Sequence, residues 1–263
     1  MDAPTRLPAL FVSHGSPLLA VEDSPAGRFL DGLGDALPRP RAIVVASAHY
    51  ASARAAVGAH PRPATVHDFN GFPAPLYDIV YPAPGDPDLA ADIAARLEDA
   101  GLGASLQPAR GLDHGVWVPL RRMYTQADIP VVPLSVLPDA DAATHIAIGR
   151  ALTPLRDEGV LVVGSGGFVH NLGDLDWAHR DAPLPAWALA FSDWMHAAIA
   201  ARDWAALVDW QQQAPNARHS HPTVEHLMPL FVALGAAGEA PEPRVLHRSH
   251  QLGSLALDAF AFD

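Results

Sequence analysis

Hydrophobic positions are grouped in short blocks along the chain, and four of these blocks have the length and character of buried strands. Continuous apolar runs of this kind are typical of strands that are covered on both faces, as in parallel sheets. The four runs span Ala9–Val12, Ala42–Ala46, Pro130–Val136 and Gly159–Val163.

Between these runs, apolar residues recur at helical spacing in four longer segments. One of them opens with Asp86 as an N-cap and Pro87 at the first helical position, and it stops at Gly101. The four segments span Ser24–Leu37, Asp86–Gly101, Asp141–Leu155 and Pro185–Ala201. Alternating strand and helix patterns predict an α/β fold: a single domain over residues 1–263, with helices flanking a largely parallel central sheet.

The last ten residues have a different pattern, because large apolar residues alternate with small or polar ones from Ser254 to Asp258 and again from Ala259 to Asp263. Alternation with a period of two indicates a strand. We expect this late strand to lie at an edge of the sheet.

Composition narrows the class of protein. The chain has 263 residues, of which 49% are hydrophobic and 17% charged, so it can bury a sizeable core. A net charge of −12 argues against nucleic acid and anionic membranes as partners. There is no cysteine, no signal-like N-terminus and no apolar run long enough to span a membrane. We therefore expect a cytoplasmic protein, of undetermined oligomeric state.

The most informative count is histidine, at 14 residues against 17 lysines and arginines together. His14 and His49 each follow a predicted strand, and ligands of open α/β sheets bind beyond the carboxyl ends of the strands. Neighbouring strands lie ~4.8 Å apart, so both imidazoles could reach one metal ion. His170 follows a third strand, after the turn 164–167, whose glycines allow close backbone approach. A single histidine is more often a surface or core residue, but three at strand ends favour a site.

A further candidate is His221, which precedes Pro222. A residue before proline is kept out of helical geometry, so we expect a helix from Pro222 with His221 fixed at its entrance. Glu225 is a possible carboxylate ligand, and His219 and His226 lie near in the sequence. The spacing does not match a zincin helix. The alternative, that His221 is only a helix cap, stays open.

His114 stands in the tripeptide Asp113-His114-Gly115, which we expect in a loop before an apolar stretch. A histidine beside an acid can relay protons. The tripeptide by itself is weak evidence for that role.

The segment from His60 to Gly85 is rich in proline, glycine and aromatic residues. It is too long for an idle connection, so we expect it to shape or cover a site. Five of its side chains could line a flat slot for an aromatic ring, although ordinary surface packing explains each of them nearly as well. They are His67, Asp68, Phe69, Phe72 and Tyr77.

Seven motifs occur in one order over nearly the whole chain: SHGSP, SAHY, HDFNGFP, YPAPG, GLDHGVWVPL, GSGGFVHNL and HPTVEHLMPL. Together they resemble the DOPA 4,5-dioxygenase branch of the class III extradiol ring-cleaving dioxygenases, which is related to the catalytic subunit of protocatechuate 4,5-dioxygenase. One departure is Tyr50, where related sequences often have tryptophan. That difference would alter a pocket wall and leave the metal site intact.

The resemblance implies an α/β enzyme that opens the ring of a catechol with O₂ to give a muconic semialdehyde. It implies His14, His49 and His221 as ligands of a non-haem ion, with Fe(II) in the active enzyme and Zn(II) as an alternative bound ion. It implies His170 as the acid–base residue and as a fourth ligand. It also implies that His114 orients the substrate or relays protons.

Two other functions remain compatible with the histidine pattern. A zinc-dependent hydrolase could use the same ligands with a metal-bound water, and its activity would be indifferent to O₂ and to oxidation of iron. A structural or regulatory metal site closed by four histidines is the second alternative. The Asp-His-Gly loop at His114 opposes it, because a structural zinc site has no use for such a residue.

Overall fold

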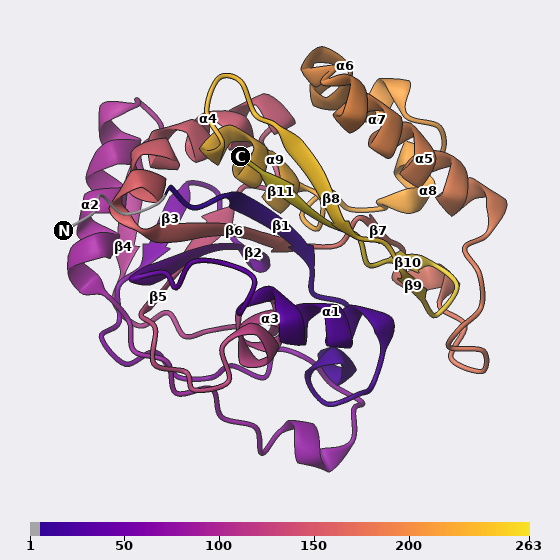
Figure 1. Ribbon diagram of the computed structural model, residues 1–263, viewed down its shortest axis with the longest axis horizontal. Helices are drawn as coiled ribbons and strands as arrows, with labels where there is room; N and C mark the ends of the chain where they lie inside the picture. The colour runs from indigo at the N-terminus through magenta and orange to yellow at the C-terminus, as the bar shows by residue number, and fades with distance from the viewer. Residues whose placement is uncertain (1–5) are drawn as a thin grey trace.

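The fold is seen in a computed structural model that describes residues 6–263 (Figure 1), and it is built around an eight-stranded sheet in the order β4-β3-β5-β2-β6-β1-β11-β8. The strands are β1 (Ala9–Ser13), β2 (Ala42–Ala51), β3 (Ala55–Gly58), β4 (Ala104–Gln107), β5 (Val131–Val136), β6 (Val160–Gly166), β8 (Pro243–His247) and β11 (Ala259–Phe262). A second, small sheet joins β7 (Val169–His170), β10 (Leu255–Ala256) and β9 (His250–Gln251).

The four strands expected from the apolar runs are β1, β2, β5 and β6, and they form the centre of the sheet. All of them run parallel, with Val44 of β2 opposite Val162 of β6 and Phe11 of β1 opposite Gly164. Their apolar residues are buried on both faces, as continuous runs require. The predicted α/β fold with a largely parallel sheet is confirmed.

The C-terminal strand is present, but its expected place at an edge is wrong. β11 is antiparallel to β1, with Phe260 opposite Phe11, and its other side is covered by β8. The covering strand Pro243–His247 carries proline, arginine and histidine, so its composition did not mark it as a strand. All four residues of β11 are therefore buried.

Helices cover both faces of the sheet (Figure 1). α1 and α3 lie on one face, and α2, α4 and α9 lie on the other. The α-helices are α1 (Pro25–Leu33), α2 (Pro87–Asp99), α3 (His114–Met123), α4 (Ala142–Leu152), α5 (Ala186–Ala201), α6 (Trp204–Val208), α7 (Trp210–Gln213), α8 (Ala217–Ser220) and α9 (Met228–Ala236). Short 3-10 turns occur at η1 (Pro17–Ala20), η2 (Ala74–Leu76), η3 (Thr153–Glu158) and η4 (Leu172–Asp174).

The four expected helices are confirmed as α1, α2, α4 and α5. The side chain of Asp86 accepts a hydrogen bond from the amide of Leu89 at 2.9 Å, which caps α2 as predicted. Gly101 has φ = +73°, the left-handed conformation that ends a helix.

The helix expected from Pro222 begins six residues later, at Met228. His221 is the C-cap of the preceding helix α8, and turns occupy residues 222–227. The proline that opens the helix is Pro229, which lies in its first turn. In the structure, His226 and not His221 therefore lies at the helix entrance.

Glycines at the end of β6 let this entrance lie directly against the sheet. A Cβ atom at Gly164 would stand 2.0 Å from the carbonyl oxygen of Pro229. A Cβ atom at Gly166 would stand 2.1 Å from the carbonyl oxygen of His226. The amide of Gly167 donates a hydrogen bond to this carbonyl oxygen at 2.9 Å. Any larger residue at position 164 or 166 would push the α9 entrance away from β6.

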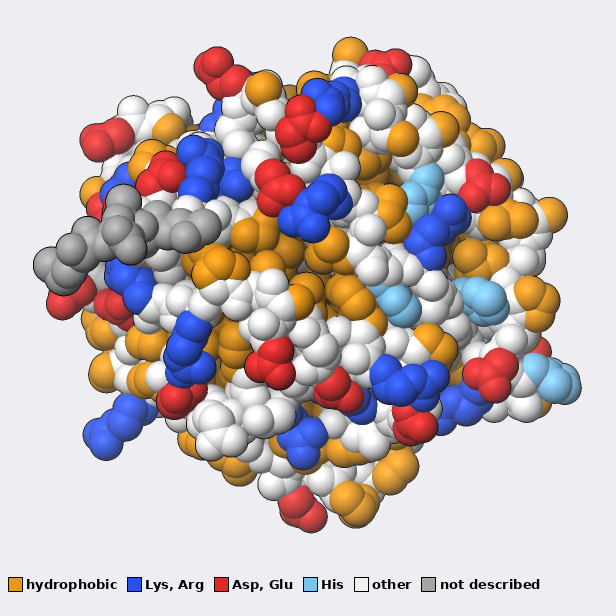
Figure 2. Space-filling model, in the orientation of Figure 1, with side chains coloured by type: hydrophobic (Ala, Val, Ile, Leu, Met, Phe, Trp, Pro, Cys, Tyr) orange, Lys and Arg blue, Asp and Glu red, His pale blue; other side chains and the backbone are white. Residues whose placement is uncertain are grey.

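The surface is mixed in charge on the face shown in Figure 2, where acidic and basic side chains are interspersed. None of the helices described within residues 6–263 combines the length and the apolar character that crossing a membrane demands.

Candidate metal centre

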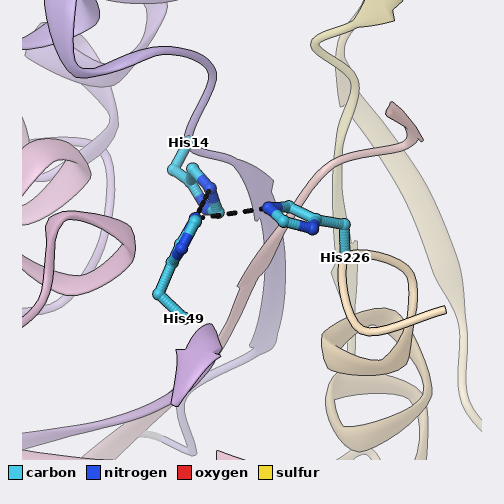
Figure 3. A group of neighbouring side chains, drawn as sticks. All are labelled: His14, His49 and His226. Carbon is cyan, nitrogen blue, oxygen red and sulfur yellow. Dashed lines mark hydrogen bonds between the residues drawn. The ribbon is translucent and has the colours of Figure 1, made fainter. Parts of the chain in front are cut away.

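Three histidines from three segments converge at the carboxyl ends of the central strands (Figure 3). His14 follows β1, His49 lies near the end of β2, and His226 lies in the turn before α9. The Nε2 atoms of His14 and His49 are 3.0 Å apart, and those of His49 and His226 are 3.2 Å apart. Strand ends and a helix entrance thus bring three imidazoles to one point.

The backbone around His14 is held on two sides. The hydroxyl of Ser13 donates to the carbonyl oxygen of Asp258 at 2.8 Å, and the amide of His14 donates to that of Gly166 at 3.0 Å. Gly15 then takes φ = +61°, which turns the chain away from the sheet. His14 is therefore fixed where β1 ends.

A buried ion pair supports the strand that carries His49. The carboxylate of Asp113 accepts from the hydroxyl of Ser47 at 2.6 Å and from the guanidinium of Arg110 at 2.5 Å. The same guanidinium donates to the carbonyl oxygen of His49 at 3.2 Å. Asp113 is therefore the N-cap of α3 and at the same time an anchor for the end of β2.

Each of the three imidazoles has an oxygen beside its other ring nitrogen. Nδ1 of His14 lies 3.1 Å from the hydroxyl of Ser165, which donates its own proton to the carbonyl oxygen of Gly115. Nδ1 of His226 lies 3.0 Å from the carboxylate of Glu225. Nδ1 of His49 lies 3.5 Å from the carboxylate of Asp68. The hydrogen-bond partners of His14 and His226 place the proton on Nδ1 and leave an Nε2 lone pair facing the centre, and at His49 the nearby carboxylate favours the same form.

Burial keeps this group uncharged. Desolvation, followed by the neighbouring histidines, lowers the pKa of His14 and of His226 well below its usual value. Desolvation and the nearby His114 lower the pKa of His49 to about 3, although Asp68 opposes the shift. All three are neutral imidazoles at pH 7, which is the form that binds metal.

This arrangement fits a transition-metal ion. The three Nε2 atoms lie within 4.8 Å of one another, and neutral imidazoles suit iron and zinc alike. A second group within that distance joins His49, Asp68 and His114, but there the carboxylate serves as an acceptor for His114. The His14–His49–His226 group is therefore the candidate metal centre.

His221, expected as the third ligand, is not in this group. It is buried, and its Nε2 donates to the carbonyl oxygen of Phe168 at 3.1 Å. Its ring packs 5.4 Å from that of Phe191 and 5.6 Å from that of Trp210. Desolvation lowers the pKa of His221 to about 4, although the hydrogen bond to Phe168 acts to raise it. His221 is thus part of the core behind the site, because the helix begins at Met228 and not at Pro222.

The other two expected histidines line the same cavity as the metal centre. The ring of His170 stacks on that of His226 with centroids 3.4 Å apart, outside the convergent group. Nδ1 of His114 lies 3.0 Å from the carboxylate of Asp68, which also accepts from the amide of His114 at 2.9 Å. His114 begins α3 and does not lie in a loop.

The segment from His60 to Gly85 contributes part of the cavity wall through Asp68, Phe69 and Phe72. His67 and Tyr77 are not among the cavity-lining residues. His67 Nε2 lies 3.0 Å from the carbonyl oxygen of Ile79. The hydroxyl of Tyr77 lies 3.5 Å from the carbonyl oxygen of Phe69. These two side chains hold the loop in shape, while the other three face the site.

The cavity has a volume of about 330 Å³, within the usual range for small-molecule sites. Its outer wall includes Leu172, Leu175 and Trp177, which follow β7, and Leu252 and Leu255 near β10. No sequence pattern had singled these residues out, because they lie in short irregular connections.

His226 and Ser165 belong to the candidate metal centre, and the sequence reasoning selected neither of them. Two signals could have found His226: the glycines at the end of β6, which need a close backbone partner, and the neighbouring Glu225, which is an acceptor for Nδ1. Ser165 carries no such signal, since only the three-dimensional structure brings it to His14.

Residues 8–256 match the family model described as the catalytic LigB subunit of aromatic ring-opening dioxygenase. The chain belongs to the LigB family. It is 40% identical to the 4,5-DOPA dioxygenase extradiol of Beta vulgaris, covering 96% of this chain and 95% of that one. It is 42% identical to the 4,5-DOPA dioxygenase extradiol of Escherichia coli K12, over 96% and 93% of the two chains.

A crystal structure of an uncharacterized protein from Escherichia coli K12 superposes with a TM-score of 0.82 at 36% identity, covering 98% of this chain and 100% of that one. The resemblance found in the sequence motifs is therefore confirmed. The chain is an extradiol ring-cleaving dioxygenase, and LigB dioxygenases depend on a metal that the three-histidine group can hold.

Proposed function

We propose that the protein uses Fe(II) to open the ring of a catechol with O₂, giving a muconic semialdehyde. The substrate is a DOPA-like or other dihydroxyphenyl compound, in keeping with the names of the relatives from Beta vulgaris and Escherichia coli. The observation that carries the proposal is the set of three neutral imidazoles whose Nε2 atoms converge while their Nδ1 atoms have acceptors.

His14, His49 and His226 would hold the ion. When bound, it supplies the positive charge that favours deprotonation of a catechol and the redox chemistry that O₂ requires. Three protein ligands leave positions for a diol and for O₂. The fixed tautomers of the histidines keep their lone pairs directed at the centre before the ion arrives.

His170 is the proposed proton-transfer residue. Desolvation, followed by the nearby His221, lowers its pKa to about 4, so its imidazole is neutral at pH 7 and can accept a proton from a catechol hydroxyl. The same group can return that proton later in the reaction. Such acid–base groups typically contribute ~10²–10⁴-fold in rate.

His114 is the proposed orienting residue. Its Nδ1 proton is directed to Asp68, which leaves Nε2 as an acceptor for a substrate hydroxyl. Burial opposes ionisation of Asp68, but the side-chain and backbone hydrogen bonds from His114 lower the pKa of Asp68 to about 2. The carboxylate is therefore ionised at pH 7 and holds the His114 ring in one orientation.

Loading the purified protein with Fe(II) without oxygen, then adding O₂ and a panel of catechols, tests this function. We expect oxygen uptake and a yellow ring-opened product, and no uptake by the Zn(II)-loaded protein. A hydrolytic activity that persists with zinc and ignores O₂ would contradict the proposal.

The role of His170 makes a separate prediction. His170→Ala should bind metal nearly as the parent does but lose ~10²-fold or more of its turnover, because only the proton-transfer group is removed. Metal content and oxygen uptake measured on the same preparation separate the two effects. Turnover at the parent rate would assign the proton transfer to another residue.

A further inference from the structure

One polar side chain interrupts the apolar part of the cavity wall. Among the cavity-lining residues in the described part of the chain, residues 6–263, Ser16 is the only one that carries a hydroxyl. The Oγ atom of Ser16 is buried, and it has no hydrogen-bond partner within the same residues. A buried hydroxyl without a partner is unfavourable, so its presence beside a ligand cavity calls for an explanation.

Comparison with Ser24 shows that the hydroxyl of Ser16 is free of its usual structural role. Both serines precede a proline that opens a helical turn, Pro17 in η1 and Pro25 in α1. The hydroxyl of Ser24 caps its helix by accepting from the amide of Gly27 at 3.1 Å. The hydroxyl of Ser16 makes no capping bond, so it stays available to a molecule in the cavity.

Ser16 lies close to the position where a catechol would be held. It comes two residues after His14 of the metal centre, a separation of at most about 7 Å along the chain. Residues 15–17 line the cavity together with His14. A catechol bound at the centre extends its ring and substituent away from the histidines, into the part of the cavity that these residues border.

The other hydrogen-bond donors of the cavity wall are assigned already or lie at its exposed mouth. The metal-centre histidines use Nε2 for the ion, and their Nδ1 atoms face oxygen atoms. The Nδ1 proton of His114 is directed to Asp68, and His170 is the proposed proton-transfer residue. Trp177, which carries an indole N–H, is 53% exposed. Among the lining side chains of residues 6–263, Ser16 is thus the buried donor that is free to contact a substituent.

The charge of the wall decides which substituent this donor contacts. Asp68 is ionised, and its Oδ1 accepts from the ring and the amide of His114. Its Oδ2 lies 3.5 Å from Nδ1 of His49, so this oxygen is open to a cation. An ammonium group would be drawn to Asp68, whereas a carboxylate would be repelled by it and would need a donor elsewhere. The hydroxyl of Ser16 is on another segment of the wall, and its proton can rotate toward such an acceptor.

We infer that Ser16 is a specificity-determining residue whose hydroxyl donates a hydrogen bond to a carboxylate on the ring substituent of the catechol. The inference rests on the proposed catechol dioxygenase function and identifies the substituent that the site recognises. A DOPA-like substrate carries both a carboxylate and an ammonium group. Its carboxylate would then face Ser16, and its ammonium group would face Asp68.

Hydrocaffeate and 4-propylcatechol make a matched pair for the test, because they share the catechol and a three-carbon substituent but only hydrocaffeate has a carboxylate. With the Fe(II)-loaded protein, Ser16→Ala should lower kcat/KM for hydrocaffeate ~10-fold or more, because it removes a hydrogen bond to a charged group. It should leave kcat/KM for 4-propylcatechol nearly unchanged. An equal decrease for both catechols, or no decrease for hydrocaffeate, would overturn the inference.

Ser24→Ala is the matched control, because it also removes a serine hydroxyl before a helix-opening proline, at a position outside the cavity lining. It should lower the free energy of unfolding through the lost cap and leave the ratio of kcat/KM for the two catechols unchanged. Ser16→Cys keeps a weak donor of similar shape and should give a smaller loss for hydrocaffeate alone. If Ser16→Ala does not fold, the cysteine variant decides the test by the same comparison.

Dopamine, whose substituent has the same reach but ends in an ammonium group, tests the sign of the charge. Its kcat/KM should be insensitive to Ser16→Ala. A decrease for dopamine without one for hydrocaffeate would assign the hydroxyl to ammonium binding and overturn the inference.

Calorimetric binding to the Zn(II)-loaded protein separates this inference from the proposed function. Hydrocaffeate should bind the parent more tightly than it binds Ser16→Ala, whereas 4-propylcatechol should bind both alike. If neither catechol is cleaved by the Fe(II)-loaded protein but this difference in binding is found, the function fails and the role of Ser16 stands. If both are cleaved and Ser16→Ala binds hydrocaffeate as the parent does, the function stands and the inference fails.

Discussion

At the scale of single residues, the metal centre depends on acceptors as much as on ligands. An imidazole can carry its proton on either nitrogen, and only the form with a free Nε2 can bind an ion at the point where the three rings meet. Ser165 and Glu225 are hydrogen-bonded to Nδ1 of His14 and His226 and select that form, and the carboxylate of Asp68 favours it at His49.

Replacing the histidines one at a time distinguishes ligand from core. His226→Ala should weaken Zn(II) or Fe(II) binding more than ~100-fold, because it removes an Nε2 from the convergent group. His221→Ala should keep the metal but lower the free energy of unfolding, since it empties a buried position. Metal titration and urea unfolding measure the two effects, and equal loss of metal in both variants would refute the assignment.

Ser165→Ala tests the acceptor beside His14. Without the hydroxyl, Nδ1 of His14 loses its partner, and we expect metal affinity to fall ~10–100-fold. Ser192→Ala is the control, because Ser192 is equally buried but its hydroxyl lies near Asp258. The comparison uses metal affinity from competition with a chelator; a parent-like affinity in Ser165→Ala would show that tautomer selection is unimportant.

The sequence was sufficient to predict His14 and His49 because both follow strongly apolar strands, whose parallel order fixes where their ends meet. His226 was not predictable in the same way. It lies in a turn whose position depends on where α9 begins, and the proline signal at Pro222 predicted that start six residues too early. The close contact of this turn with Gly166 is a tertiary feature that the local sequence does not show.

At the scale of elements, the contact between β6 and the α9 entrance determines where His226 lies. Gly166→Ala would place a Cβ atom 2.1 Å from the carbonyl oxygen of His226, so the turn must shift. We expect a loss of metal affinity together with ~1–3 kcal/mol of stability.

The matched control for Gly166→Ala is Gly32→Ala in α1, where an added Cβ meets nothing within 4 Å. It should leave metal binding unchanged and stabilise the protein by ~0.5–1 kcal/mol. Parent-like metal affinity in Gly166→Ala would show that the turn adapts without moving His226.

The central strands and the longer helices were predictable because their patterns are local. The short strands β3, β4 and β8 were not, since each is only four or five residues long and β4 and β8 carry exposed positions. β11 is buried because β8 covers it. The prediction that the C-terminal strand lies at an edge was therefore wrong because β8 was not predicted.

At the scale of the whole molecule, the buried histidines make stability depend on pH. The folded-state pKa of His221 is about 4 and its ordinary value is 6.5, so the unfolded chain binds the proton first as pH falls. The stability that neutral His221 provides is complete above about pH 6.5 and is lost progressively down to about pH 4.

His221→Gln isolates this contribution. Between about pH 7.5 and about pH 5.5, the free energy of unfolding of the metal-free parent should fall by ~1 kcal/mol more than that of the variant. Urea unfolding in the presence of a chelator measures the difference. Identical pH dependence in the two proteins would show that His221 keeps its ordinary pKa.

The three converging imidazoles bear no negative charge, and this has a consequence for the cell. Ligands of this kind bind copper and zinc more strongly than ferrous iron, following the Irving–Williams order. Affinity alone therefore does not select ferrous iron at this site. With Fe(II) as the proposed active ion, we expect the fraction of active protein to follow the supply of iron relative to zinc and copper at the time of folding, so that the same chain is active when made in one growth medium and inactive when made in another.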